Sequence, residues 1–220
     1  RSLVGSEMCI RDRLISGRGS NMASLIEAAR ADTCAYEIAC VISNRPDAPG
    51  LQIADNAGIA SVALDHKALG TREALDAAIH DALLANSVEL VVCAGFMRIM
   101  TSDFTSKWEG SIVNIHPSLL PLFKGVNTHE RALQAGVRVH GCSVHFVSAE
   151  LDAGAIIAQG VVKVMPGDDA DALAARVLPV EHRIYPAVLN ALAEGRIRLE
   201  NARAVFSDDD AANLSILATG

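Results

Sequence analysis

The stretch VNIHPSLLPLFKG, residues 113–125, joins the end of an apolar run to a rigid loop. Asn114 and His116 are two residues apart, so in a β-strand their side chains point to the same face. Pro117 has no N–H for a central ladder, so the strand is predicted to end at His116. Polar side chains at the carboxyl end of a strand are typical of the ligand crevice of an open α/β sheet. The stretch therefore predicts a reacting centre at this edge.

Apolar β-branched runs alternate with alanine-rich segments of helical period along the first half of the chain. Strands are predicted at 38–43, 60–64, 89–96 and 111–116, and helices at 21–31, 51–56, 71–86 and 102–107. This alternation indicates a Rossmann-like, doubly wound parallel sheet. The fold class is thus α/β, a mostly parallel sheet with mixed C-terminal strands.

Short loops separate the later elements. A helix is predicted at 128–135, strands at 143–147 and 156–164, a long helix at 169–194 interrupted near Pro179, and a hairpin of 196–200 with 204–207. Because short connections join neighbouring antiparallel strands, we expect these strands to extend the sheet as its mixed part.

Length, charge and cysteine usage limit the possible functions. The chain has 220 residues, half of them apolar, and a formal net charge of −7, which argues against a nucleic-acid partner. No apolar run approaches the roughly 20 residues that span a bilayer, so we expect no membrane association. The five cysteines lack CxxC spacing and no signal peptide is evident, which predicts reduced thiols and a cytoplasmic location. The seven histidines show no metal-ligand spacing, so no metal is expected.

The first thirteen residues, RSLVGSEMCIRDR, do not form the apolar run expected of a buried parallel strand. Only Leu14 and Ile15 have that character before the glycine loop begins. We expect residues 1–13 to be a non-native leader that replaces the true first strand. Residues 14–200 are predicted to form a single domain, and residues 201–220 a C-terminal hairpin and tail.

The segment SGRGSN, residues 16–21, lies between a strand and a helix, with Ser20 or Asn21 as the predicted N-cap. Glycines let the backbone approach a ligand, and N–H groups at a helix start attract an anion. The loop lacks the third glycine of a dinucleotide site and the GK[ST] ending of a triphosphate loop, which favours a monophosphate. The alternative is an ordinary turn between strand and helix.

Three polar residues stand in otherwise apolar settings: Asn114, His116 and Asp152, the last within ELDAG at 150–154. Acyl transfer to an amine needs a hydrogen-bond donor for the oxyanion, a group that handles protons, and a carboxylate that favours a charged imidazole. An amide, an imidazole and a carboxylate meet these needs. Ser118 lacks the GxSxG elbow of a nucleophile, so direct attack by the amine is favoured. The alternative for His116 is a hydrogen-bonded structural histidine.

Five segments together resemble the phosphoribosylglycinamide formyltransferases, a folate-dependent family of purine biosynthesis. They are SGRGSN, AGFMRIM at 94–100, NIHPSLLP at 114–121, HGCSVHFVSAELDAG at 140–154 and EHRIYP at 181–186. The resemblance covers roughly residues 14–200 and implies the formyltransferase fold. It implies 10-formyltetrahydrofolate as formyl donor, phosphoribosylglycinamide as acceptor, and a monomer or homodimer that acts on small molecules.

The resemblance also implies roles for particular residues. Asn114, His116 and Asp152 would be catalytic, and Glu181 would bind the ribose hydroxyls or the glycinamide end. The substrate phosphate would lie on Gly19, Ser20 and Asn21. The implied folate-binding residues are Arg72, Met97, Arg98, Ile99, Met100, Asn114, Ser148, Ala149, Glu150 and Leu151, with Arg72 at the glutamate tail. Ser143 and His145 would support Asp152 or an ordered water, or merely pack.

Two features limit the resemblance. Leu178, Pro179 and Val180 stand where relatives often carry polar residues that contact the substrate. From composition alone, AGFMRIM is a strand end with core residues.

The rival functions are a formyl-folate hydrolase with the same three residues, and a nucleotide-binding α/β module without chemistry. A tRNA formyltransferase would need a further basic domain, which this chain has neither the length nor the charge to supply.

Overall fold

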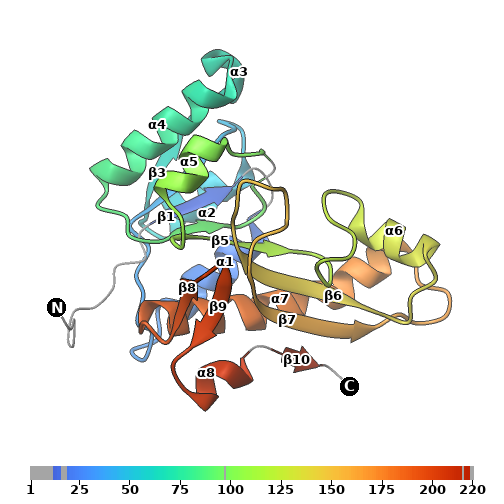
Figure 1. The fold of residues 1–220 in the computed structure, drawn as a ribbon. Helices are drawn as coiled ribbons and strands as arrows, with labels where there is room; N and C mark the ends of the chain where they lie inside the picture. The colour runs from blue at the N-terminus through green and yellow to red at the C-terminus, as the bar shows by residue number, and fades with distance from the viewer. Residues whose placement is uncertain (1–11, 16–18, 97, 215, 219–220) are drawn as a thin grey trace.

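The computed structural model describes residues 12–15, 19–96, 98–214 and 216–218. An eight-stranded sheet with the order β10-β7-β6-β5-β4-β1-β2-β3 forms the centre of these residues (Figure 1). Its parallel strands are β1 Asp12–Ile15, β2 Cys40–Ser43, β3 Ala60–Ala63, β4 Val91–Cys93 and β5 Ile112–His116. Strands β2, β4 and β5 are almost wholly buried, as expected for strands covered on both faces.

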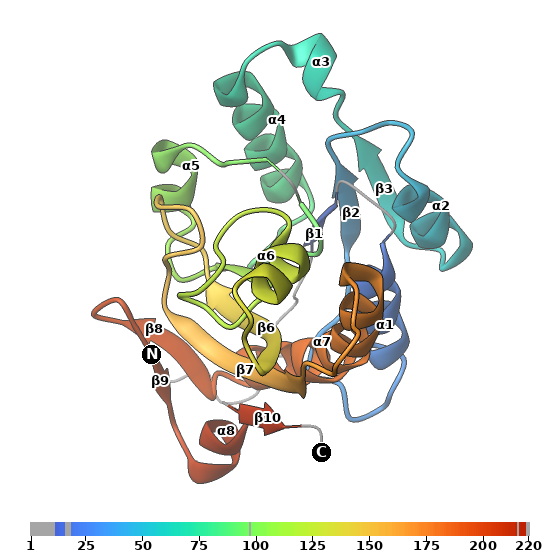
Figure 2. The same cartoon turned by 90° about the vertical axis from the view of Figure 1, so that its right-hand side faces the viewer.

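Helices cover both faces of the parallel part (Figures 1 and 2). The helices of this half are α1 Ser20–Ala28, α2 Pro49–Asn56, α3 His66–Leu69, α4 Arg72–Ala85 and α5 Ser102–Lys107. Ile79 and Leu83 of α4 and Phe104 of α5 pack in one apolar cluster on one side of the sheet. Helices α1 and α2 lie on the other side, where Met22 and Ala54 share a second cluster. The core is therefore split by the sheet into two layers.

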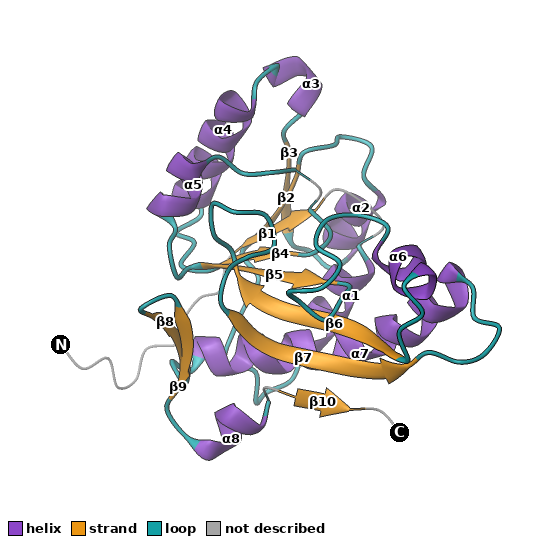
Figure 3. Cartoon of the chain, turned by 45° about the vertical axis from the view of Figure 1, so that its right-hand side comes forward, coloured by secondary structure: helices purple, strands orange, loops and turns teal. Residues whose placement is uncertain are grey.

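The later strands form the mixed part of the sheet (Figure 3). Strand β6 Val139–Phe146 runs antiparallel to β5, β7 Ile156–Lys163 antiparallel to β6, and β10 Ile216–Ala218 parallel to β7. Helix α6 Thr128–Gln134 packs on the long helix α7 Ala170–Ala193, and a hairpin of β8 Ile197–Glu200 and β9 Arg203–Phe206 precedes α8 Asp209–Asn213. The mostly parallel α/β sheet with mixed C-terminal strands is confirmed.

Helix α7 continues through Pro179, so the predicted interruption is wrong. Pro179 removes the hydrogen bond to the carbonyl of Ala175, but both residues lie on the exposed side of the helix, where water can take the bond. Val177, Val180 and Ile184 on the opposite side are buried against the sheet. Burial of this apolar side holds the helix together across the proline.

The start of α1 also differs from the prediction. Gly19, rather than Ser20 or Asn21, is the N-cap, with a φ of 78°. A Cβ at this position would lie 3.1 Å from the Cα of Gly50. Glycine is therefore required both by the left-handed backbone and by the close approach of α2.

Strand β1 lies between β2 and β4 at the centre of the sheet. Asp12 and Arg13, which the sequence analysis assigned to the leader, belong to this strand, and residues 1–11 lie outside the described part of the chain. Within that part, no helix is both long and apolar enough to cross a bilayer.

Candidate active site

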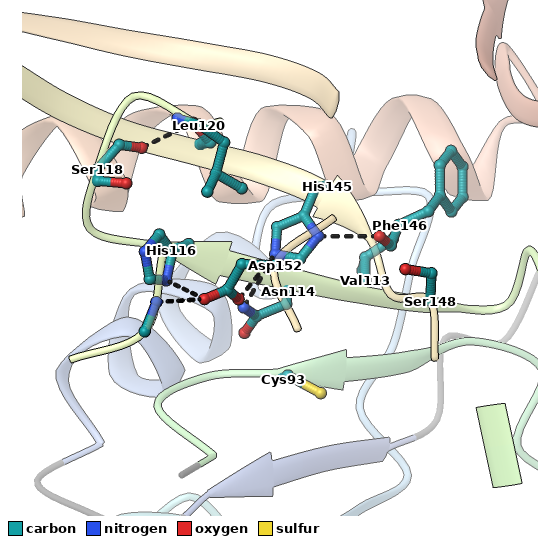
Figure 4. A network of polar contacts seen from close by, with 12 residues as sticks. Cys93, Val113, Asn114, His116, Ser118, Leu120, His145, Phe146, Ser148 and Asp152 are labelled. Carbon is teal, nitrogen blue, oxygen red and sulfur yellow. Dashed lines mark hydrogen bonds and ion pairs between the residues drawn. The ribbon is translucent and has the colours of Figure 1, made fainter. Parts of the chain in front are cut away.

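Strands β5 and β6 bring the candidate catalytic residues together at one edge of the sheet. In their antiparallel register Asn114 faces His145, and His116 faces Ser143. All four side chains therefore lie on the same face of the ladder. Asp152 comes from the loop between β6 and β7 and lies between the two histidines (Figure 4).

His116 is a buried imidazole with a protein partner at each nitrogen. Its Nδ1 lies 3.4 Å from Oδ2 of Asp152, and its Nε2 lies 3.1 Å from the carbonyl oxygen of Phe123. The side chains of His116 and Asp152 are only 7% and 8% exposed. Since a carbonyl and a carboxylate both accept hydrogen bonds, only the doubly protonated ring donates to both partners.

The turn that carries Asp152 is constrained at two points. Asp152 has a φ of 48°, and its Oδ2 accepts a hydrogen bond of 2.8 Å from the backbone N–H of Gly125. Two residues later, a Cβ on Gly154 would lie 1.8 Å from the carbonyl oxygen of Phe146. The glycine of ELDAG thus lets the turn lie directly against β6, which places the carboxylate beside His116.

His145 orients Asn114. Its Nδ1 donates a hydrogen bond of 2.9 Å to the carbonyl of Phe146, which leaves the lone pair of Nε2 to accept from Nδ2 of Asn114 at 3.1 Å. Burial lowers the pKa of His145, so the ring is neutral near pH 7 and remains an acceptor. The nearest carboxylate oxygen, Oδ1 of Asp152, is 3.8 Å from Nε2.

Ser143 holds the loop after His116 and makes its hydrogen bonds there rather than with Asp152. Its hydroxyl donates to the carbonyl of Ser118 at 2.7 Å and accepts from the N–H of Leu120 at 3.0 Å. Gln159 of β7 also donates to this hydroxyl, at 2.9 Å. The loop is therefore fixed by buried polar contacts from β6 and β7.

Two cavities meet at these residues. The larger, of about 600 Å³, includes His116, Asn21 and Glu181 in its lining. The smaller, of about 80 Å³, is lined in part by Arg98, Ile99, Met100, Ser148, Ala149, Glu150 and Leu151. Asn114 and Asp152 line both cavities. Ligands bound in the two cavities would therefore meet at these two side chains.

In the lining of the larger cavity, Asn21 of α1 and Glu181 of α7 are joined by a hydrogen bond. Nδ2 of Asn21 donates to Oε2 of Glu181 at 2.7 Å, while Oδ1 of Asn21 is buried without a protein partner in the described part of the chain. Burial raises the pKa of Glu181, and the bond from Asn21 opposes that shift. An unfilled acceptor beside a buried carboxyl suits a ligand with hydroxyl or N–H donors.

The other predicted binding residues have different positions relative to the two cavities. Gly19 and Ser20 lie directly before Asn21 at the start of α1. Arg72, the first residue of α4, is exposed and absent from the lining of both cavities. Met97 lies outside the described residues. Arg98 also lines a third cavity of about 660 Å³, together with Arg45 and Lys67.

Sequence reasoning missed the backbone groups that hold the centre, namely the carbonyl of Phe123 and the N–H of Gly125. It also missed Phe96 and the segment 126–128, which line the larger cavity. The glycine of FKG at 123–125 was the one available signal, because a glycine with a φ of 81° marks a loop that bends sharply.

The fold and the site define an α/β enzyme of group transfer, with a polar centre between two ligand cavities. Residues 13–189 match the family model for formyl transferase. The chain belongs to the formyl transferase family, which confirms the resemblance inferred from its motifs. Among the described residues, no cluster of three or more His, Cys, Asp or Glu side chains could hold a metal.

Full-length relatives carry a specific name. The phosphoribosylglycinamide formyltransferase of Escherichia coli is 45% identical over 86% of this chain and 90% of its own length. That of Haemophilus influenzae is 44% identical over 86% of this chain and 89% of its own. The trifunctional purine biosynthetic protein adenosine-3 of Gallus gallus is 49% identical over 86% of this chain, which spans only 19% of that protein.

Solved structures agree with these relatives. The glycinamide ribonucleotide transformylase 1 of Symbiobacterium toebii superposes with a TM-score of 0.89 at 40% identity, covering 94% of this chain and 98% of that one. The phosphoribosylglycinamide formyltransferase of Brucella melitensis gives a TM-score of 0.80 at 46% identity, over 83% and 94% of the two chains.

Proposed function

We propose that this protein transfers a formyl group from 10-formyltetrahydrofolate to the amine of phosphoribosylglycinamide, a step of purine biosynthesis. The observation that carries the proposal is the pair of cavities that meet at Asn114 and Asp152. A transfer reaction needs two substrates whose reacting atoms meet at one polar centre. The names of the full-length relatives support phosphoribosylglycinamide as the acceptor and formyl as the group transferred, and the motif resemblance implies formyl-folate as the donor.

The larger cavity suits the ribonucleotide. Its phosphate would lie at the start of α1, where Asn21 follows Gly19 and helix N–H groups attract an anion. The ribose hydroxyls would donate to Glu181 or to the unfilled oxygen of Asn21. The folate would enter from the smaller cavity, between the segment 98–100 and the segment 148–151. This arrangement brings the glycinamide amine and the formyl carbon to Asn114.

In the proposed reaction the amine attacks the formyl carbon, a C–N bond forms, and the carbonyl oxygen becomes an oxyanion. One N–H of Asn114 is taken by His145, so the second N–H of the amide is the donor for that oxyanion. Collapse of the intermediate breaks the bond to N10 of the folate. The proton lost by the amine passes to N10 through a water held beside Asp152.

His116 contributes positive charge to this centre. Because Asp152 and the Phe123 carbonyl occupy its two nitrogens, a direct hydrogen bond to the oxyanion requires the Phe123 contact to open. With that contact closed, the charged ring acts on the oxyanion through space, and Asp152 stabilises the charge. The proposal describes a cytoplasmic enzyme that acts on small molecules and uses no metal ion.

The test is an absorbance assay for loss of the formyl-folate donor, run with and without phosphoribosylglycinamide. Consumption that requires the glycinamide supports the transferase. Consumption without it identifies a hydrolase and overturns the proposal, and no consumption by folded protein overturns it as well. His116→Ala serves as the inactive control, and Arg198→Gln, on the exposed hairpin strand β8, as the neutral one.

A further inference from the structure

One short loop holds both His116 and Asp152. The carbonyl of Phe123 accepts from Nε2 of His116 at 3.1 Å, and the N–H of Gly125 donates to Oδ2 of Asp152 at 2.8 Å. These two backbone groups belong to the segment 123–126. The distance between the imidazole and the carboxylate therefore depends on the position of this segment.

The segment does not have the backbone conformation of a relaxed chain. Phe123 in the segment and Asn127 directly after it have φ values of 54° and 55°, in the left-handed region that non-glycine residues other than asparagine seldom occupy. Gly125 between them has a φ of 81°. Such a conformation persists only where the surrounding structure holds it.

The side chain of Arg131 contacts Phe123, Lys124 and Val126 of this segment at once. The Nη1 atom of Arg131 donates to the carbonyl of Lys124 at 2.5 Å and lies 3.4 Å from the carbonyl of Val126. Its guanidinium carbon lies 5.8 Å from the centroid of the Phe123 ring, a cation–π distance. Arg131 is exposed and does not line either cavity.

We propose that Arg131 is a positioning residue that fixes the segment 123–126 so that Phe123 and Gly125 hold His116 and Asp152 in register. The inference rests on the proposed formyl transfer for its kinetic consequence. Arg131 lines neither of the two proposed substrate cavities, so it acts through the segment. A second contact, from Nζ of Lys124 to Glu150 at 3.1 Å, joins the segment to the Asp152 turn.

The kinetic test compares Arg131→Gln with Arg198→Gln, an exposed arginine that pairs with Glu200 away from the site. Loss of register lowers kcat by on the order of tenfold in the Arg131 variant, with little change in KM for the formyl-folate. Arg198→Gln leaves both constants unchanged. An unchanged kcat in Arg131→Gln overturns the proposal.

A double-mutant cycle separates positioning from a general loss of stability. In an Asp152→Asn background the register no longer matters, so adding Arg131→Gln costs little further activity. If Arg131 served only the stability of the fold, its fractional effect would be the same in both backgrounds. That equality would contradict the proposal.

Proteolysis tests the same point without any substrate. Endoproteinase Lys-C cuts after lysine, and Lys124 lies inside the segment. Arg131→Gln should raise the rate of cleavage at Lys124 several-fold, while cleavage at Lys163 of β7 stays at the wild-type rate. Equal rates at Lys124 in both proteins would refute the role of Arg131. This measurement is valid even if phosphoribosylglycinamide proves to be the wrong substrate. A failure of the proposed role of Arg131 can therefore be distinguished from a failure of the proposed formyl transfer.

Discussion

The amide nitrogen of Asn114 lies 3.1 Å from Nε2 of His145, directly across the β5–β6 ladder. The other nitrogen of His145 is held by the carbonyl of Phe146, which fixes the neutral tautomer with its lone pair toward Asn114. The orientation of the Asn114 amide is therefore set by a buried histidine that itself is not expected to touch the oxyanion. Asn114 is thus the proposed hydrogen-bond donor to the oxyanion, and His145 is the residue that orients it.

We predict that His145→Leu lowers kcat by about tenfold, because Asn114 loses the acceptor that fixes its amide. His145→Gln, whose amide oxygen can still accept from Asn114, should retain more activity than the leucine variant. Steady-state kinetics, corrected for the folded fraction by circular dichroism, measures both. Equal losses in the two variants would show that packing rather than the hydrogen bond is the important contribution of His145.

Replacing either member of the His116–Asp152 pair should remove most of the catalysis. We expect His116→Ala and Asp152→Ala to lower kcat by on the order of a hundredfold or more, because the charge beside the oxyanion is lost. Binding of phosphoribosylglycinamide, measured by calorimetry, should survive, since Asn21 and Glu181 also line the larger cavity and remain in both variants. Turnover close to that of the wild type would reject the assignment.

Most of the parallel half of the fold was predictable because most of its elements carry their own signal, whereas β1 and the short helix α3 do not. Helix α5 has the predicted bounds, and α4 differs by one residue at each end. Strand β6 begins at Val139 rather than at residue 143, because its first residues pair with β7 and this partner is not visible in local sequence. For the same reason β10, which pairs with β7 from a distance of more than fifty residues, was not predicted as a strand.

The candidate site, too, was only partly predictable from the sequence. Asn114, His116 and Asp152 could be selected because an amide, an imidazole and a carboxylate are unusual in apolar surroundings, and the structure brings them together. The partners of His116 and Asp152 in the segment 123–126 are backbone atoms, which every residue possesses. Apart from the glycine at position 125, no residue type marks them, so their contribution follows from the three-dimensional structure.

A buried histidine behind the site predicts a dependence of stability on pH. Burial, and after it the neighbouring ring of His129 at 5.2 Å, lower the pKa of His140 to about 4. In the unfolded chain a histidine has a pKa of about 6.5. At pH values from about 6.5 down to about 4, the unfolded chain therefore binds more protons at this residue than the folded chain does. His140 therefore contributes stability above this window that is lost as the pH falls through it.

The matching experiment measures the free energy of unfolding of wild type and His140→Leu at pH 7 and pH 5. We expect the wild type to lose about 2 kcal/mol more than the variant over this change, from the shift of His140 alone. Other histidines with lowered pKa values, such as His145, remain in both proteins and largely cancel in the comparison. An identical loss in the two proteins would mean that His140 does not remain neutral in the fold.

Glu181 should show a conflict between stability and binding. The side chain is buried and burial raises its pKa, so the charged form is disfavoured in the fold. A carboxyl with a raised pKa contributes stability below its unfolded pKa and loses it as the pH rises through the folded pKa. At neutral pH Glu181 therefore lowers the free energy of unfolding relative to a neutral side chain of the same shape.

We expect Glu181→Gln to raise the melting temperature by a few degrees at pH 7, since the glutamine oxygen still accepts from Asn21 and no charge is buried. The same change should raise KM for phosphoribosylglycinamide by about tenfold or more, because a charged acceptor for its donors is lost. KM for the formyl-folate should not change, since Glu181 lines only the larger of the two cavities. A lower melting temperature, or an equal rise of both KM values, would show that Glu181 supports the fold and not the ribonucleotide.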